Sequence, residues 1–166
     1  MLKKQEKVIY TIGTSNRTLE EFIRILKLYR IEILVDVRRF PTSKFEHFKK
    51  ENLKAEIGKA GIRYHYLGEE LGGYREGGYL EYVKTEKFAN GLEKLVKIAS
   101  KGRTALMCCE KFPWKCHRRF IGYELIKKGW KVMHVIDKDR VWIPKGKAEM
   151  LDDKVKFLQF DLKRKI

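Results

Sequence analysis

Apolar and polar positions along the chain alternate between two patterns: short apolar runs, and longer stretches with a helical period. Five short runs are expected to be strands, at residues 8–12, 31–37, 62–67, 104–107 and 131–136, and the run at 31–37 is almost continuously apolar, as expected for a strand covered on both faces. Between most of them, apolar residues recur every three or four positions, as on a helix with one buried face. This alternation predicts an α/β fold with a mostly parallel, twisted sheet of about five strands and helices on both faces, because parallel neighbours need crossover connections.

Residues that favour helix ends divide the periodic stretches into four expected helices. Thr18 and Glu21 have the S/T-x-x-E spacing of a capping box, which satisfies free amides in the first turn. The other three helices are expected to begin near Asn52, Thr85 and Pro113. Glycines that can end these helices follow at Gly61, Gly102 and Gly129.

Two segments do not fit the alternation. Residues 68–78 contain five glycines, too many for the interior of an element, and predict a mobile surface loop. Near the C-terminus, residues 147–152 have a weak helical pattern and residues 155–162 alternate like an edge strand. Because no linker or repeat divides the chain, residues 1–166 are expected to form a single α/β domain.

Charge and cysteine content bear on the setting of the protein. Lys and Arg number 38 against 22 Asp and Glu, a net charge of +16. Such a basic chain attracts phosphate backbones, but Lys and Glu enrichment is equally typical of heat-adapted proteins. The apolar run at residues 8–12 is too short for a signal peptide or a membrane span, and three clustered cysteines do not form a secreted disulfide framework. We therefore expect a cytoplasmic protein with no membrane partner.

Polar residues gather where three of the expected strands end. These loops contain Ser15, Asp36 with Arg38, and Cys108 with Glu110. Parallel strands end at the same edge of a sheet, and in doubly wound folds that edge forms the ligand crevice. The three loops are therefore expected to build one composite site.

Four blocks of sequence, in order along the chain, carry a family resemblance. They are Tyr-Thr-Ile-Gly-Thr-Ser-Asn-Arg, Leu-Val-Asp-Val-Arg-Arg-Phe-Pro, Tyr-Leu-Gly-Glu-Glu-Leu-Gly-Gly, and Leu-Met-Cys-Cys-Glu followed by Cys-His-Arg. Together they resemble the domain-of-unknown-function family numbered four-eight-eight, over residues 10 to about 136. The motif residues of that family fall on Gly13, Ser15, Asp36, Arg38, Cys108, Glu110, Cys116, His117 and Arg118. Thr14 departs from the pattern, because many relatives have His there, and the resemblance implies no reaction or cofactor.

Arginines in and after these loops predict an anion site. Guanidinium groups bind phosphate or carboxylate oxygens through paired hydrogen bonds, and amides at helix N-termini add donors. The candidate anion-binding residues are Ser15, Arg38, Arg39 and Arg118. The alternative is that the arginines are solvated or pair with Asp36 and Glu110.

Cys116 is the candidate nucleophile. It is expected in the first turn of a helix, beside His117 and Arg118, where a thiolate is favoured. Cys108, at a strand end, is either a second reacting group or a small core residue. Cys109 is expected to be buried and inert.

Other chemistry remains open for the same residues. Asp36 and Glu110 can form a general acid/base pair, hold a divalent cation against a phosphate, or pair with arginines. A zinc site from Cys108, Cys116 and His117 is disfavoured because adjacent Cys and His side chains diverge on a helix. A redox-active disulfide between Cys108 and Cys116 is a further alternative.

The leading hypothesis is an α/β enzyme that binds a nucleotide, nucleic acid or other phosphorylated ligand at the carboxyl edge of the sheet. Its candidate catalytic residues are Cys116, Glu110, Asp36, Cys108 and His117. The alternatives are a non-catalytic nucleic-acid-binding module and, less favoured, a thiol or metal sensor. The sequence indicates no particular cofactor and leaves the oligomeric state open.

Overall fold

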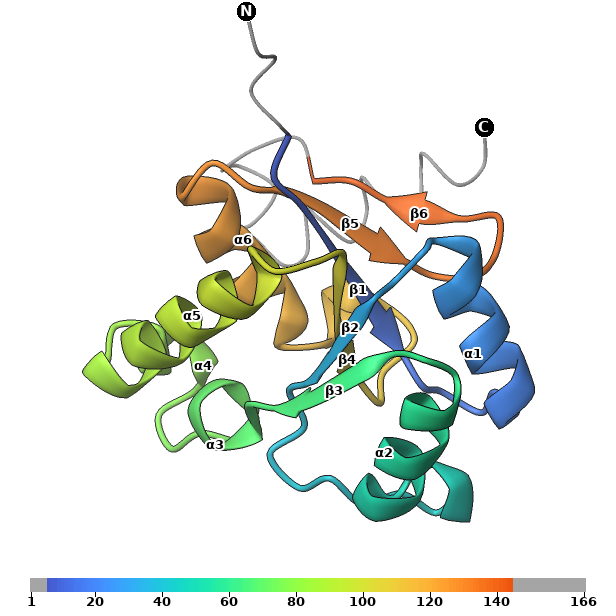
Figure 1. The fold of residues 1–166 in the computed structure, drawn as a ribbon. Coiled ribbons are helices and arrows are strands. Elements are labelled where there is room, and N and C mark those ends of the chain that lie inside the picture. The colour runs from blue at the N-terminus through green and yellow to red at the C-terminus, as the bar shows by residue number, and fades with distance from the viewer. Residues whose placement is uncertain (1–5, 145–166) are drawn as a thin grey trace, which may run out of the picture.

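Strands and helices alternate along the chain in the computed structural model, which describes residues 6–144 (Figure 1). The strands are β1 (Val8–Gly13), β2 (Ile33–Asp36), β3 (Arg63–Tyr66), β4 (Thr104–Cys108), β5 (Lys131–Val135) and β6 (Val141–Trp142). The helices are α1 (Leu19–Leu28), α2 (Lys50–Lys59), α3 (Gly68–Leu71), α4 (Tyr79–Tyr82), α5 (Glu86–Ala99) and α6 (Arg118–Lys127). Two 3-10 turns, η1 (Glu46–Phe48) and η2 (Pro113–Lys115), precede α2 and α6. The helix and edge strand expected beyond residue 144 lie outside the described residues.

The six strands form one sheet in the order β3-β2-β4-β1-β5-β6. The first five are parallel, and β6 runs antiparallel to β5. Gly13 pairs with Cys108, and Asp36 pairs with Met107, so β1, β2 and β4 end at the same level. This register confirms the predicted α/β fold and the expectation that the three polar loops share one edge.

Both faces of the sheet are covered, and strand residues alternate between two cores (Figure 1). On the face packed by α5 and α6, the core includes Ile9, Ile33 and Leu106. On the face packed by α1 and α2, it includes Tyr10, Leu34 and Met107. Burial on both faces explains why these strands have continuous apolar sequences.

Of the four predicted helix starts, those at Thr18 and Thr85 are confirmed and two are wrong. The start near Pro113 is wrong because Pro113 begins η2, and α6 begins only at Arg118. Thr18 Oγ1 accepts from the Glu21 amide at 3.1 Å, and Thr85 Oγ1 accepts from an amide of α5 at 3.3 Å. The Asn52 prediction is wrong, because α2 already begins at Lys50. The Asn52 side chain instead donates to the Glu46 carbonyl oxygen at 2.8 Å and ties α2 to the turn before it.

A mobile loop was predicted at residues 68–78, and this prediction is wrong for the first part of the segment. Residues Gly68–Leu71 form α3, and Gly72 after it is buried. A Cβ atom on Gly68 would lie 2.0 Å from the Arg38 carbonyl oxygen, so glycine is needed here for close packing. These glycines let the segment pack on the loop after β2.

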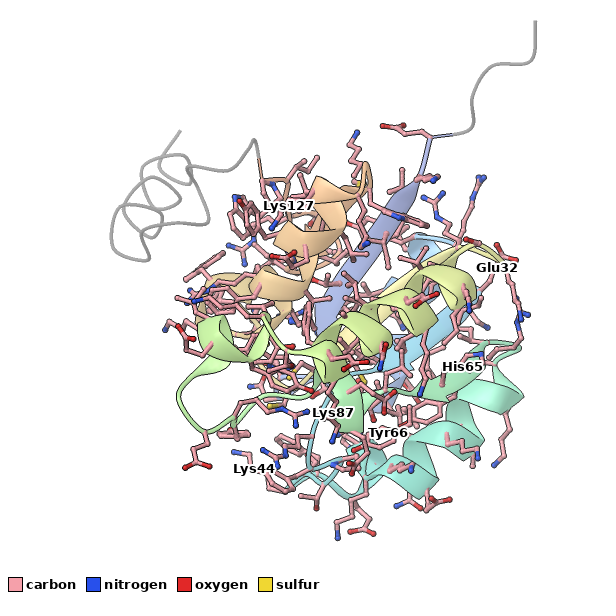
Figure 2. The ribbon with its side chains drawn as sticks, turned by 90° about the vertical axis from the view of Figure 1, so that its left-hand side faces the viewer. Glu32, Lys44, His65, Tyr66, Lys87 and Lys127 are labelled. Carbon is pink, nitrogen blue, oxygen red and sulfur yellow. The ribbon has the colours of Figure 1, made fainter. Side chains whose placement is uncertain are left out.

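Basic side chains extend from several separate segments of the chain. Lys44, Lys87 and Lys127 extend from three separate segments (Figure 2). Lys127 pairs with Glu124 at 3.1 Å, as is common for solvated helix surfaces. The net charge alone therefore identifies no binding surface. Among the helices of residues 6–144, none has both the length and the apolar character needed to cross a bilayer.

Candidate functional site

A cavity of about 590 Å³ lies at the edge where β2 and β4 end. Six residues predicted from the sequence line it: Arg38, Arg39, Cys108, Glu110, Cys116 and His117. Asp36 and Arg118 are fully buried and contact lining residues without lining the cavity themselves. Ser15 does not line the cavity, although its amide donates to the Cys109 carbonyl oxygen at 2.8 Å.

Backbone contacts hold the three loops together. The amides of Thr14 and Val37 donate to the carbonyl oxygens of Cys108 and Met107 at 2.8 and 2.9 Å. The backbone of Gly13 packs directly against the loop after β4, since a Cβ atom on Gly13 would lie 1.9 Å from the Glu110 carbonyl oxygen. The position of the loop after β4 therefore depends on glycine at this point of β1.

The variant Gly13→Ala is expected to lose about 1–3 kcal/mol of unfolding free energy, because the loop after β4 must move to admit a methyl group. Urea denaturation measures the loss. Gly58→Ala is the matched control, since a Cβ atom there meets nothing within 4 Å and alanine favours the helix. Equal stability of the two variants would contradict tight packing at Gly13.

Cys116 precedes α6 instead of lying in its first turn. The turn η2 ends at Lys115, Cys116 is extended with φ −132° and ψ 148°, and α6 begins at Arg118. The predicted first-turn position is therefore wrong. Because Cys116 is not helical, its Sγ atom and the His117 Nδ1 atom lie 3.7 Å apart, so the expected divergence of these side chains is wrong as well.

The Cys116 sulfur is surrounded by hydrogen-bond donors. The Arg118 amide and Nε atom lie 3.5 and 3.4 Å from Sγ. The Cys108 sulfur is close as well, because the two sulfur atoms and a His117 nitrogen all lie within 4.8 Å of one another. Such a set of donors favours a negatively charged sulfur.

Arg118 supplies the strongest evidence for that charge. Its side chain is completely buried. Beyond the sulfur, it contacts Thr11 Oγ1 at 3.4 Å and the Glu110 carbonyl oxygen at 2.5 Å, and it meets no carboxylate within residues 6–144. Arginine keeps its charge in proteins, and a buried charge needs a partner. Among these contacts only Cys116 can supply a negative charge.

The pKa values of the three cysteines are linked. Burial alone would raise the pKa of Cys116, but the hydrogen bond from Cys108 and the charges of Arg118 and His117 hold it well below the usual thiol value. The pKa of Cys108 is raised well above the usual thiol value, because hydrogen bonding to the neighbouring sulfur atoms of Cys109 and Cys116 and burial both favour its protonated form. A bond from Cys108 would also lower the pKa of Cys109 to about 6. The Cys108 thiol has only one proton, however, so it can donate fully to only one of the two sulfur atoms. Arg118 and His117 favour negative charge on Cys116, so Cys116 is the better acceptor of that proton.

Cys109 is exposed, so the prediction that it is buried is wrong. Strand β4 ends at Cys108, and the chain leaves the sheet at the next residue. Cys109 is therefore accessible to reagents in solution.

His117 is oriented by a backbone carbonyl. Its Nε2 atom lies 3.1 Å from the Val37 carbonyl oxygen, which can only accept, so Nε2 carries a proton. The Nδ1 atom consequently faces Cys116, where it accepts a hydrogen bond when neutral or donates one when protonated.

Asp36 and Arg38 form a buried ion pair. Arg38 Nε and Nη2 donate to Oδ1 and Oδ2 of Asp36 at 2.9 and 2.8 Å, a bidentate arrangement. The Tyr64 hydroxyl donates to Oδ2 at 2.5 Å, and Arg38 Nη1 donates to the Phe48 carbonyl oxygen at 2.7 Å. Proton transfer by Asp36 and anion binding by Arg38 stay predictions, but this geometry favours the ion-pair alternative.

Two other basic residues are available to an anion in the cavity. Arg39 is half-buried and donates to the Tyr74 carbonyl oxygen. Lys115 is exposed and also lines the cavity. The sequence interpretation missed Lys115, whose only signal was its place between the strand end and Cys116. Arg38 also lines the cavity, but its guanidinium is held by Asp36 and the Phe48 carbonyl oxygen, whereas Arg118 does not line the cavity at all.

Cys108, Cys116 and His117 could also hold a metal ion. Their donor atoms converge within 4.8 Å, and two sulfurs with one nitrogen suit Zn²⁺ with an open fourth position. The hydrogen bond from His117 to Val37 is typical of a metal-binding histidine. Against this reading, the Arg118 guanidinium beside the Cys116 sulfur would repel a cation.

The model of the family described as Domain of unknown function DUF488 matches residues 18–125 of this α/β chain. The chain therefore belongs to that family. No curated protein matches it, and no solved structure does. The matched segment contains Asp36, Arg38 and the loop from Cys108 to Arg118, but begins after Ser15. Because the family has no assigned reaction, the function must be argued from the site.

Proposed function

We propose that the chain is a cytoplasmic thiol-dependent enzyme that acts on a phosphorylated ligand at the carboxyl edge of the sheet, with Cys116 as its nucleophile. The observation that carries this proposal is the buried Arg118 guanidinium, whose available counter-charge within residues 6–144 is the Cys116 sulfur. A thiolate is the nucleophilic form of cysteine. Cys116 lines a cavity that also presents the cationic side chains of Arg39 and Lys115.

The chemistry follows from the positions of these groups. Arg39 and Lys115 bind phosphate oxygens. The Cys116 sulfur forms a bond to an electrophilic atom of the ligand, while the bond to the leaving group breaks and the leaving group keeps the electron pair. Glu110, which lines the same cavity, protonates the leaving group and later takes a proton from the water that releases the ligand from sulfur.

Alkylation against pH tests the thiolate. In a Cys109→Ala background, Cys116 is expected to react with iodoacetamide well below pH 8.5, roughly the pKa of an ordinary thiol. The reason is that a lowered pKa leaves the sulfur ionised at lower pH. Intact-protein mass spectrometry gives the rate, and the same protein with Cys116→Ser reports any reaction of Cys108. A rate that rises only near the ordinary thiol pKa would contradict the proposal.

Protection from alkylation tests the ligand class. Inorganic phosphate and adenosine monophosphate are expected to slow the alkylation of Cys116, whereas adenosine is not, because the phosphate provides the charge. The variant Arg39→Ala/Lys115→Ala is expected to lose this protection. Equal effects of adenosine and its monophosphate would overturn phosphate binding. If one equivalent of Zn²⁺ abolished alkylation and a chelator restored it, a metal sensor would replace the enzyme as the better function.

A further inference from the structure

We propose that the substrate of this site is a single-stranded nucleic acid, which lies along the carboxyl edge of the sheet and occupies two cavities that border the loop after β4. The inference rests on the proposed function for the chemistry at Cys116. The binding surface itself is argued from separate residues and can be tested separately.

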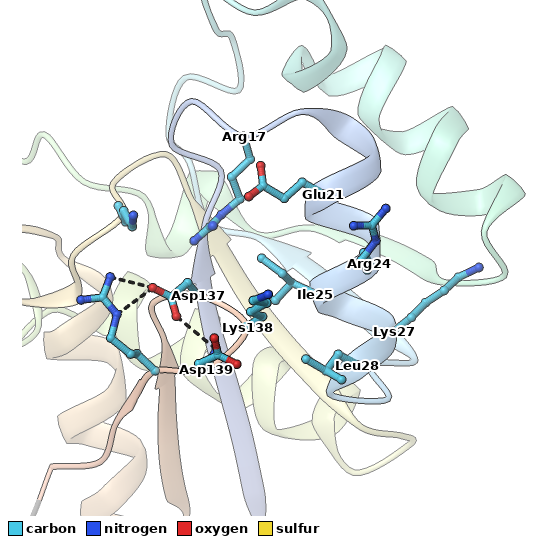
Figure 3. Close-up of a pocket in the computed structure, with 11 residues that line it drawn as sticks. Arg17, Glu21, Arg24, Ile25, Lys27, Leu28, Asp137, Lys138 and Asp139 are labelled. Atoms are coloured by element: carbon cyan, nitrogen blue, oxygen red, sulfur yellow. Dashed lines mark hydrogen bonds and ion pairs between the residues drawn. The ribbon is translucent and has the colours of Figure 1, made fainter.

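The second cavity has a volume of about 920 Å³ and lies between α1 and the turn that joins β5 to β6 (Figure 3). Six basic and three acidic side chains line it, so its surface is positive. Arg24 and Lys27 extend from α1, and Lys138 comes from the turn (Figure 3). A positive concave surface concentrates phosphate groups.

The charges in this cavity are not equally available. Asp137 is neutralised by Arg140, whose Nη2 atom lies 2.6 Å from its carboxylate. In contrast, Arg24, Lys27 and Lys138 make no ion pair with any residue in the described part of the chain. These three cations can therefore bind phosphates without first breaking an existing ion pair.

Two consecutive residues of the loop after β4 line the two cavities. Glu110 lines the cavity that contains Cys116, and Lys111 lines the second cavity. Consecutive Cα atoms are only about 3.8 Å apart. Both cavities therefore border the loop after β4, and a ligand that occupies both must be long enough to cross this loop, which suits a chain of nucleotides better than a single nucleotide.

Exposed aromatic rings favour a single strand over a duplex. Phe40 and Tyr74 line the first cavity with 60% and 82% of their surfaces exposed, and their ring centroids lie 6.1 Å apart. The Arg39 guanidinium lies 5.6 Å from the centre of the Phe40 ring. Exposed aromatic rings beside a basic groove bind the faces of unpaired bases. A duplex keeps those faces stacked inside, so only a single strand can use these rings.

The test is the binding of a fluorescently labelled single-stranded oligonucleotide of about a dozen nucleotides, measured by fluorescence anisotropy at several salt concentrations. Binding is expected to weaken steeply with salt, because phosphate contacts release counterions. The variant Arg24→Ala/Lys27→Ala/Lys138→Ala is expected to lose about tenfold or more in affinity and to show a smaller salt slope. The variant Phe40→Ala/Tyr74→Ala is expected to lose about tenfold in affinity, while the dependence of affinity on salt concentration stays unchanged.

A matched control removes three lysines from α5 and α6. The variant Lys87→Ala/Lys97→Ala/Lys127→Ala has the same change of charge, and it is expected to keep the affinity of the parent protein. No binding of single strands at low salt, equal binding of duplex, or an equal loss in this control would overturn the inference. If low-pH alkylation of Cys116 persisted without nucleic-acid binding, the substrate class alone would fail. Binding without low-pH alkylation would instead overturn the proposed chemistry.

Discussion

Replacing Arg118 by leucine is expected to slow the alkylation of Cys116 near neutral pH. The rate should fall about tenfold for each unit by which the pKa of Cys116 rises. Burial favours the neutral thiol, so removing the buried guanidinium lets the pKa of Cys116 rise. The fraction of thiolate at neutral pH then falls. The measurement is the alkylation rate against pH in the Cys109→Ala background, where Cys116→Ser again reports the contribution of Cys108.

Two further variants make this result interpretable. Arg118→Lys keeps the charge but loses the Nε contact at 3.4 Å, so its rate is expected to lie between those of the parent and the leucine variant. Lys97→Leu removes a positive charge from the exposed surface of α5 and is expected to leave the alkylation rate of Cys116 unchanged. If both Arg118 variants fold and react at the parent rate, Arg118 is not the counter-charge of a thiolate.

The sequence was sufficient to predict most of the fold. The predicted strands match all five parallel strands, although β3, Arg-Tyr-His-Tyr, is not an apolar run. The βα alternation required Asp36 and Cys108 to lie at the same edge. Strand β6 was missed, because two residues, Val141–Trp142, carry no periodic pattern. The role of the glycines near Gly68 was also missed, since close packing against the loop after β2 depends on a contact distant in sequence.

The sequence indicated several residues that line the cavity, but it did not indicate how they are arranged. Polar residues at strand ends indicated Cys108, Glu110 and Cys116, and all three line one cavity. The pattern after Pro113 does not distinguish one 3-10 turn from the start of a helix, so the extended conformation of Cys116 was missed. The burial of Arg118 was missed because charged side chains are rarely buried without a partner, and here the partner is a sulfur atom rather than a carboxylate.

The Asp36–Arg38 pair gives the second large effect. Asp36→Leu is expected to lose about 3–5 kcal/mol of unfolding free energy, because Arg38 remains buried without its counter-charge. Arg38→Met leaves the carboxylate unpaired and is expected to lose a similar amount. The double variant Asp36→Leu/Arg38→Met is expected to recover much of the loss, since a buried ion pair can be replaced by apolar side chains of similar size. Urea denaturation of all four proteins gives the coupling energy.

The cycle is best measured in a Tyr64→Phe background, because the Tyr64 hydroxyl donates to Asp36 at 2.5 Å and would otherwise lose its acceptor. Single variants as stable as the parent would contradict a structural role for the pair. Protection of Cys116 from alkylation then separates the two interpretations of Arg38. If the folded double variant is still protected by adenosine monophosphate, Arg38 serves the fold, and Arg39 and Lys115 bind the phosphate. If protection is lost while low-pH alkylation persists, Arg38 binds the anion as the sequence predicts.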